Sequence, residues 1–214
     1  MRSIPFNLTL LASAVFSLPA YAQQQPWDIG IRIGVSAADG EPANDIPTAG
    51  LVVHFALDGR WRIGAALDRS EYDVEEPAKL AGIVQDPAVE VIDALAEATT
   101  LSVWAERTLT NPTRAMSLFV GSGLGAAFVD VPDVDGPRAN GGCFDVHTQV
   151  STEFIVSLLG GVRREFAERW YAEAAVRIDQ HFADWVFTDR VSGARGSVDD
   201  YLTWGAYFTV GWKW

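Results

Sequence analysis

The segment Trp204-Gly205-Ala206-Tyr207-Phe208-Thr209-Val210-Gly211-Trp212-Lys213-Trp214 decides the fold of this chain. Bulky or apolar side chains occupy its even positions, and glycine, tyrosine, threonine and lysine occupy the odd ones. Because successive side chains of a strand point to opposite faces, this period of two predicts a strand with one apolar face. Such an edge strand invites aggregation of a soluble protein. The pattern therefore favours a strand that faces lipid and pairs with the first strand to close a barrel.

The N-terminus carries the features of an export signal. Arg2 supplies a positive charge, residues 8–18 form a short apolar stretch, and Ala20 and Ala22 place small residues before a cleavage point. The apolar stretch is too short to span a bilayer. A buried N-terminal helix is the alternative, but the polar residues 23–26 follow directly. We expect a signal peptide over 1–22, cleaved after Ala22, and a single barrel domain over 23–214.

The composition narrows the class of protein. The formal net charge is −12 at pH 7, from 16 basic and 28 acidic residues. Phosphates are bound by lysine and arginine, so this balance argues against a nucleic-acid partner. The sequence has no apolar run of eighteen residues, which argues against helical spans. Cys143 is the only cysteine and cannot form an intramolecular disulfide. It is an incidental loop residue, a free thiol or the site of an intermolecular link.

The alternation of apolar and polar residues recurs along the chain. It predicts an all-β fold, an eight-stranded antiparallel up-and-down transmembrane barrel. The expected strands cover about residues 26–36, 48–57, 61–72, 98–108, 115–129, 152–166, 169–182 and 200–213. The connections near 58–60, 109–114 and 167–168 are short, and those near 37–47, 73–97, 130–151 and 183–199 are long. Because such barrels have short periplasmic turns and long extracellular loops, both termini are expected in the periplasm.

Tryptophans mark the expected periplasmic end. Indole rings favour the boundary between membrane and water, so they predict an aromatic girdle. Its expected members are Trp27, Trp61, Trp170, Trp212 and Trp214. A soluble barrel with these residues in its core is the alternative. Most of the strand glycines share the polar face, however, and small residues fit a crowded interior, which favours the bulky face as the outer one.

The polar face is expected to line a narrow lumen. Eight strands enclose a space just wide enough for side chains, and a buried charge without a partner costs several kcal/mol. We therefore expect ion pairs across the lumen, such as Arg62 with Glu106 and Arg163 with Glu173. The predicted polar network consists of Arg32, Arg62, Asp68, Glu106, Arg163, Glu173, Arg177 and Asp179. It is either a plug or a narrow gated conduit, and the bulk of Trp104, Phe119 and Leu159 favours the plug.

With these residues in place, the chain resembles the small eight-stranded outer-membrane barrels, the superfamily of OmpA, OmpX, OmpW and the opacity proteins. The architecture covers the mature chain, whereas the specific motif is only its terminal Thr209–Trp214. In that superfamily such a motif is recognised by the barrel assembly machinery. The resemblance implies this partner, with Phe208, Gly211, Trp212 and Trp214 as the assembly signal, and contact with outer-membrane lipids and lipopolysaccharide.

Catalytic, metal and cofactor sites are not expected. A nucleophile needs an adjacent base, and no outward-facing serine–histidine pair occurs in the predicted strands. His54 and His181 are predicted to point inward, and His147 lies in a long connection. Asp130, Asp133 and Asp135 form only a fragment of a calcium-loop pattern, because the closing glutamate is missing.

One long connection has helical features. Asp86-Pro87 is a good helix start, and Val89, Ile92 and Leu95 follow at helical spacing. A short amphipathic helix and a solvated loop are equally compatible with this segment.

Three functions are compatible with the sequence. The first is a non-enzymatic anchor that displays acidic loops for surface interaction or envelope integrity. The second is passage of small apolar molecules, as the resemblance to OmpW allows. The third is an outer-leaflet lipid-modifying enzyme. The extracellular partner and the ligand are not indicated by the sequence.

Overall fold

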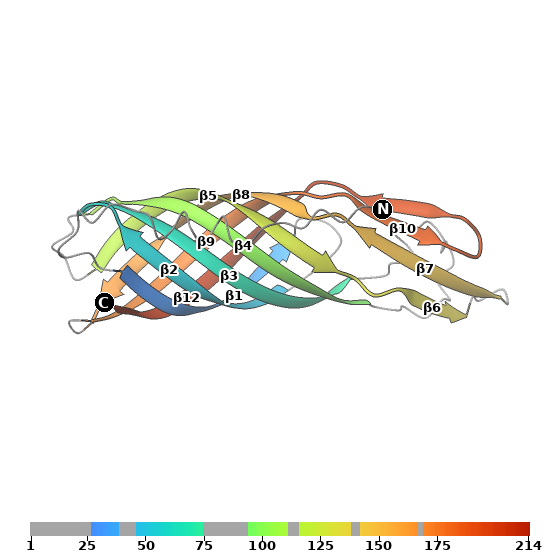
Figure 1. Ribbon diagram of the computed structural model, residues 1–214, viewed down its shortest axis with the longest axis horizontal. Helices are drawn as coiled ribbons and strands as arrows, with labels where there is room; N and C mark the ends of the chain where they lie inside the picture. Colours follow the sequence, from blue (N-terminus) through green and yellow to red (C-terminus); the bar gives the residue numbers. More distant parts are fainter. Residues whose placement is uncertain (1–26, 39–45, 75–93, 111–115, 138–141, 167–168) are drawn as a thin grey trace, which may run out of the picture.

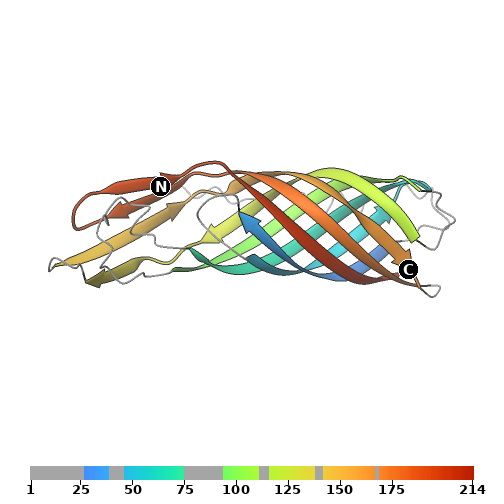
Figure 2. The ribbon, with the colours of Figure 1, turned by 180° about the vertical axis from the view of Figure 1, so that it is seen from behind.

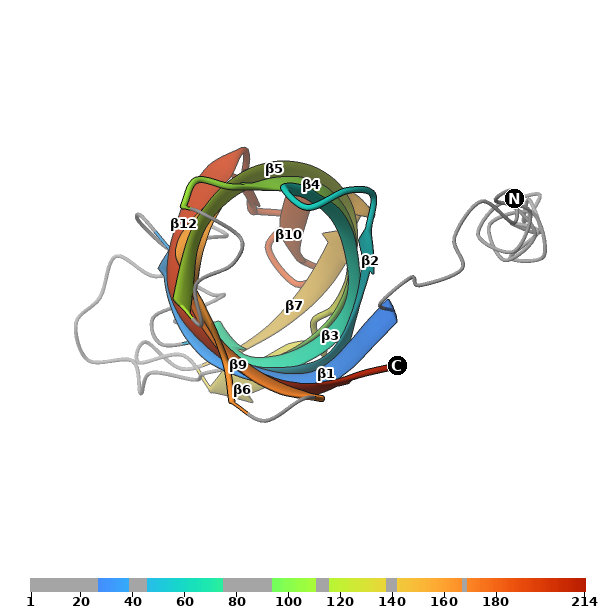
Figure 3. The same ribbon diagram turned by 90° about the vertical axis from the view of Figure 1, so that its left-hand side faces the viewer.

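The protein is an antiparallel β-barrel of eight strands, seen in the computed structural model, which describes residues 27–38, 46–74, 94–110, 116–137, 142–166 and 169–214. The strand order around the barrel is β1-β12-β9-β8-β5-β4-β3-β2 (Figures 1 and 3). Each barrel strand therefore pairs with the barrel strands that come before and after it in the chain, and the first pairs with the last. This confirms the predicted fold class. The barrel strands are β1 (Trp27–Ala38), β2 (Ile46–Ala56), β3 (Trp61–Val74), β4 (Ala94–Thr108), β5 (Met116–Asp130), β8 (Glu153–Glu165), β9 (Trp170–Phe182) and β12 (Tyr201–Lys213).

The first and last strands close the barrel. β12 pairs with β1 from Asp28 opposite Lys213 to Ala38 opposite Thr203, and Figure 2 shows the two strands side by side. The amide of Trp214 extends this seam by donating to the carbonyl of Trp27 at 2.8 Å. Closure leaves no free edge in the barrel, which removes the aggregation hazard that the C-terminal strand would otherwise carry.

The two ends of the barrel differ. At one end, which we call the turn end, lie the chain terminus Trp214 and the tight turn between β2 and β3 (Figure 1). In that turn the Asp58 carboxylate accepts hydrogen bonds from the amides of Arg60 and Trp61 at 2.6 and 2.7 Å. These hydrogen bonds hold the pKa of Asp58 below its ordinary value. The connections at 111–115 and 167–168 lie outside the described residues.

At the other end, the sheet end, two segments expected as loops form a second sheet. It contains β6 (Val134–Pro137), β7 (Cys143–Val150), β10 (Trp185–Asp189) and β11 (Arg195–Val198) in the order β11-β10-β7-β6. The prediction of irregular connections over 130–151 and 183–199 is therefore wrong. β7 alternates apolar Phe144, Val146 and Val150 with polar residues, so part of the signal for strands was present in the sequence.

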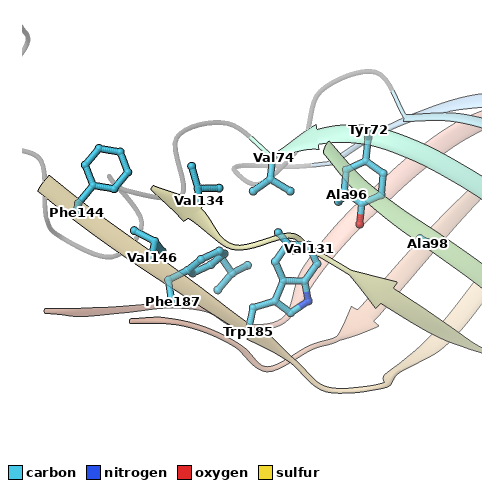
Figure 4. Close-up of a cluster of buried hydrophobic side chains, with 11 residues drawn as sticks. Tyr72, Val74, Ala96, Ala98, Val131, Val134, Phe144, Val146, Trp185 and Phe187 are labelled. Atoms are coloured by element: carbon cyan, nitrogen blue, oxygen red, sulfur yellow. The ribbon is translucent and has the colours of Figure 1, made fainter. Parts of the chain in front are cut away.

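The second sheet shares a hydrophobic cluster with the barrel, which we call the sheet-end core (Figure 4). In β3 and β4 the inward face is polar at Asp68 and Thr100 and becomes apolar toward the sheet end. The core can form because these two strands continue past the polar lumen and meet the sheet. Its buried members are Tyr72, Val74, Ala96, Ala98, Val131, Val134, Phe144, Val146, Trp185, Phe187 and Val198.

The proposed helix near residue 86 falls mostly outside the described residues, which do not include 75–93. Its last apolar position, Leu95, lies in β4, so a helix cannot extend that far. Leu95 is exposed while Ala96 is buried against the sheet-end core, which is the alternation of a strand. The described residues include no helix with the length and hydropathy that crossing a membrane requires.

Candidate functional site: the barrel lumen

Inward-facing side chains of the eight barrel strands fill the lumen with charge. Asp28, Arg32, Asp68, Glu106 and Arg177 are each buried, although their strands carry exposed apolar residues on the opposite face. The polar positions therefore gather inside because of the two-residue period and the closure of the sheet. From the turn end to the sheet end, the lumen contains three groups of residues.

The group nearest the turn end is centred on Asp28. Its carboxylate binds His54 Nδ1 at 2.7 Å and Arg163 Nη2 at 2.6 Å. The guanidinium of Arg163 lies 3.7 Å from the centre of the Tyr171 ring. Arg163 also comes within 3.8 Å of Glu173, so the expected partner is near, but the shorter contact is to Asp28.

Beside this group lie three further charged residues. Arg62 forms an ion pair with Glu106, and its Nη2 is 3.8 Å from Glu173 Oε2. The other oxygen of Glu106 accepts a hydrogen bond from the indole of Trp104 at 3.1 Å. Glu173 Oε2 and His54 Nε2 are buried without a hydrogen-bond partner.

The middle group contains two ion pairs. Arg32 pairs with Asp68, its Nε lying 3.1 Å from Oδ1. Arg177 binds Asp179 at 2.7 Å and the hydroxyl of Ser157 at 3.0 Å. The structure thus places all eight residues of the predicted network inside the barrel, in two clusters along its axis.

Large side chains fill the space between the ion pairs. The indole of Trp104 covers Gly64, where an added Cβ would lie 2.2 Å from the ring. Phe119 is only 1% exposed, and Leu159 packs against Trp104. The cavity left at this level is about 20 Å³, whereas about 200 Å³ is open toward the turn end and about 60 Å³ toward the sheet end. A 20 Å³ space holds about one water molecule, so the middle of the lumen is filled.

The group at the sheet end is built on Glu153, which is fully buried. Its carboxylate accepts hydrogen bonds from Trp185 Nε1 at 2.7 Å and from the Tyr201 hydroxyl at 3.0 Å. It also binds His181 Nδ1 at 2.8 Å, and His181 Nε2 lies 3.2 Å from the Thr203 hydroxyl. Sequence reasoning missed Glu153 as a hub, because its partner Trp185 belongs to a segment expected to be a loop.

The Glu153–His181–Thr203 chain has the order of a catalytic acid, base and hydroxyl. Thr203 and His181 lie within the ladder of β9 and β12, in which Thr203 is opposite Asp179 and His181 is opposite Tyr201. The backbone groups of the two strands hydrogen-bond across this ladder. Within the described residues, the amides of Thr203 and His181 are therefore engaged in the ladder and are not free to stabilise an oxyanion beside this hydroxyl. The arrangement serves to hold β8, β9 and β12 to the second sheet.

The predicted girdle residues lie together at the turn end of the outer face. Trp61 and Trp170 are about two-fifths exposed, and Trp214 is 80% exposed. Trp170 packs edge-on against Trp212 with ring centres 4.8 Å apart, and Trp27 packs on Phe55 at the same distance. Of the predicted assembly residues, Phe208 is exposed on the outer face, and Gly211 is buried against the Tyr171 ring.

The remaining predicted candidates lie in the second sheet and its connections. Asp133 binds His147 at 2.8 Å and Arg190 at 3.0 Å, so its charge is already matched by basic groups. Burial raises the pKa of Asp133, but the hydrogen bonds from His147 and the amide of Thr148, together with the charge of Arg190, lower it overall. Asp130 and Asp135 are exposed, and Cys143 is an exposed thiol at the start of β7.

Comparison with solved structures agrees with this architecture. OprG from Pseudomonas aeruginosa aligns with a TM-score of 0.64 at 11% identity, covering 88% of this chain and 95% of that one. A major outer membrane protein from Thermus thermophilus aligns at 0.50 and 12% identity over 88% and 99% of the two chains. The outer membrane protein AlkL aligns at 0.52 and 11% identity over 92% and 94%.

The TM-scores show a common fold, and at 11–12% identity the likeness extends to the fold alone. The chain has the closed eight-stranded architecture of the small outer-membrane β-barrels. Neither the family models nor the curated proteins give a match to the sequence.

Proposed function

We propose that this protein is an integral outer-membrane barrel with a closed lumen, which anchors and displays the second sheet at the cell surface. The turn end lies in the periplasm and the sheet end outside the cell. The observation that carries the proposal is the filled middle of the lumen beneath a structured outer sheet. Acidic residues outnumber basic ones by 28 to 16, so a basic partner or divalent cations at the surface fit the net charge of the protein.

The outer face of the barrel supports the membrane location. Large apolar residues are exposed on all eight barrel strands, so the apolar surface runs around the whole barrel. A soluble monomer, by contrast, exposes apolar patches of only a few hundred Å². Ile31, Leu51, Leu67, Leu101, Leu124, Leu158, Val176 and Trp204 are each more than 40% exposed. Arg107 and Arg169 lie 5.7 and 5.6 Å from the rings of Trp61 and Trp212, which suits a boundary with lipid headgroups.

Three proposals concern the partners and processing. Residues 1–22 are a signal peptide removed after Ala22, so the mature protein begins at Gln23, and intact-mass measurement of protein from membranes tests this. Phe208, Gly211, Trp212 and Trp214 direct the chain to the barrel assembly machinery. Outer-membrane lipids and lipopolysaccharide surround the barrel.

The closed lumen is tested by single-channel recording in planar bilayers. We expect no resolvable openings from the wild-type protein. The Trp104→Ala/Phe119→Ala double variant removes two large aromatic side chains that are buried inside the barrel. It is expected to conduct, which shows that the assay can detect an opening. Steady conductance of the wild-type protein would refute the closed lumen and favour the conduit over the anchor as its function.

The two other functions have less support. An apolar conduit requires an apolar path, whereas the lumen is lined by Arg32, Asp68 and Arg177 at its middle. A lipid-modifying enzyme requires reactive groups that face the outer leaflet, whereas His54 and His181 face inward and are bound to carboxylates. Mass spectrometry of lipid A with and without expression tests the enzyme, and an unchanged profile is expected.

A further inference from the structure

Several buried polar atoms at the turn end of the lumen lack hydrogen-bond partners, among them nitrogens of Arg62 and Arg163. Two of these atoms are potential metal ligands, His54 Nε2 and Glu173 Oε2, in residues that are 1% and 6% exposed. Leaving a polar group buried without a partner is costly, so most such groups in folded proteins have one. Both residues belong to a cluster with Glu106, in which one ligand atom of each residue lies within 4.8 Å of the others.

The orientation of His54 leaves one nitrogen available. Its Nδ1 is bound to Asp28 at 2.7 Å, so the available nitrogen is Nε2. The ring is fixed by edge-on packing against Trp104 and Tyr171, with centres 5.6 and 6.3 Å away. A histidine that donates from one nitrogen to a carboxylate and offers the other as a ligand is the usual arrangement in metal sites.

The charge of the cluster also favours a cation. Asp28, Glu106 and Glu173 carry three negative charges, whereas Arg62 and Arg163 carry two positive ones, and all five are buried or nearly so. A histidine that binds a metal must be a neutral imidazole, and in that form of His54 the five charged residues leave one negative charge for the cation to balance. A low-dielectric interior makes such an imbalance costly, and a bound cation removes it.

We propose that His54, Glu106 and Glu173 form a binding site for one divalent transition-metal cation of the zinc type, with Asp28 as the positioning residue for His54. One imidazole nitrogen and two carboxylate oxygens, without sulfur, are a ligand set that zinc and its neighbours accept, with water completing the coordination. Ligand atoms of a tetrahedral zinc site lie about 3.4 Å apart, so the two glutamates need only small rotations from their present positions.

The ion has a route to this site. The cavity of about 200 Å³ at the turn end is lined by Asp28, Arg62 and Arg163, next to the cluster. Arg62 is the competing cation, because it neutralises Glu106. The same cavity is lined by Asp58 and Glu165, toward which the Arg62 side chain turns when the metal binds.

Titration of the refolded chain with Zn²⁺ and Co²⁺ tests the site. The chain carries no affinity tag, is held in detergent, and is checked for folding by heat-modifiable migration on a gel. We expect one ion per chain by calorimetry and a Co²⁺ absorption spectrum with a nitrogen ligand. Affinity falls at least tenfold in His54→Gln and in Glu173→Gln, and tenfold to a hundredfold in Asp28→Asn. It rises several-fold in Arg62→Gln, which no structural role of Arg62 predicts.

Two matched controls locate the ion. His181→Gln and His147→Gln alter the other two histidines, each bound to a carboxylate elsewhere, and their affinities should stay within twofold of the wild type. Absence of stoichiometric binding by the wild type overturns the proposal, as does binding that survives both His54→Gln and Glu173→Gln. Should either variant fail to fold, proton spectra of the wild type decide: added Co²⁺ must broaden the imidazole signals of His54 more than those of His181, and the reverse order overturns the site.

Discussion

Replacement of Trp185 tests whether the sheet-end core holds the second sheet to the barrel. Trp185 is fully buried, packs against Phe187 and Tyr201 with ring centres 6.3 and 6.2 Å away, and donates to Glu153. Trp185→Ala removes this ring and should lower the free energy of opening of the second sheet by about 3–5 kcal/mol. Trp185→Phe keeps most of the apolar area and loses the N–H donor to a buried carboxylate, which should cost about 1–3 kcal/mol.

Hydrogen exchange of the protein in lipid nanodiscs, followed by mass spectrometry, measures this opening. In Trp185→Ala, amides of β10 and β11 should exchange roughly a hundredfold faster or more, whereas amides of the barrel strands should keep their protection. Val186→Ala is the control, because Val186 is the next residue of the same strand, is only partly buried and should cost less than about 1 kcal/mol. Unchanged exchange in Trp185→Ala would show that the sheet is held by something other than this core.

Three further predictions address the outer face, the lumen and the outer hairpin. Val103→Arg places a charge on the exposed apolar face of β4 and should cost about 2–4 kcal/mol of folding free energy in lipid. Leu109→Arg, at the turn end, should cost only about 0–1 kcal/mol. Urea titrations measure both, and equal costs would contradict the proposed membrane position. Gly64→Ala forces a Cβ against the Trp104 ring and should cost about 1–3 kcal/mol of folding free energy. Gly160→Ala should be nearly neutral, because its Cβ would lie 3.6 Å from the nearest atom. Similar unfolding midpoints for both variants would argue against a packed lumen. Burial raises the pKa of Asp189, but hydrogen bonds from the amide of Asp145 and from Ser192 lower it to about 2. The ionised carboxylate therefore stabilises the hairpin fully above its unfolded pKa of 3.8. This stabilisation is lost as the pH falls through about 2. Carbon chemical shifts of Asp189 during acid titration measure this, with Asp189→Asn as the insensitive control; titration near 3.8 would contradict the hydrogen-bonded turn.

The barrel could be predicted from the sequence because its signal is local and repeated. Each strand alternates side chains with a period of two, as the alternating burial along β1 and β12 shows. Cross-strand pairing then follows from chain order, since each short turn joins neighbours. Arg62 and Glu106, which face each other across β3 and β4, could be paired from this register alone.

The rest depended on contacts that cross the lumen or leave it. Arg163 in β8 contacts Asp28 in β1, although β8 and β1 are not neighbouring strands. This contact depends on the barrel diameter, which the alternation of side chains along each strand does not predict. The second sheet was missed because its strands are only four to eight residues long and were judged as parts of long connections. Phe144 and Phe187 alternate correctly, but their burial becomes evident only when β3 and β4 are known to continue beyond the polar lumen.

The seam between β1 and β12 has a consequence for biogenesis. Every barrel strand, β1 included, has one neighbour made shortly before or after it, but the second edge of β1 pairs with β12, the last barrel strand in the chain. Until β12 arrives, the growing sheet has two unsatisfied borders and an outer surface that water solvates poorly, so it depends on a holder in the aqueous compartment. Loss of β12 would therefore leave a polypeptide that cannot finish folding and becomes a substrate for envelope proteases.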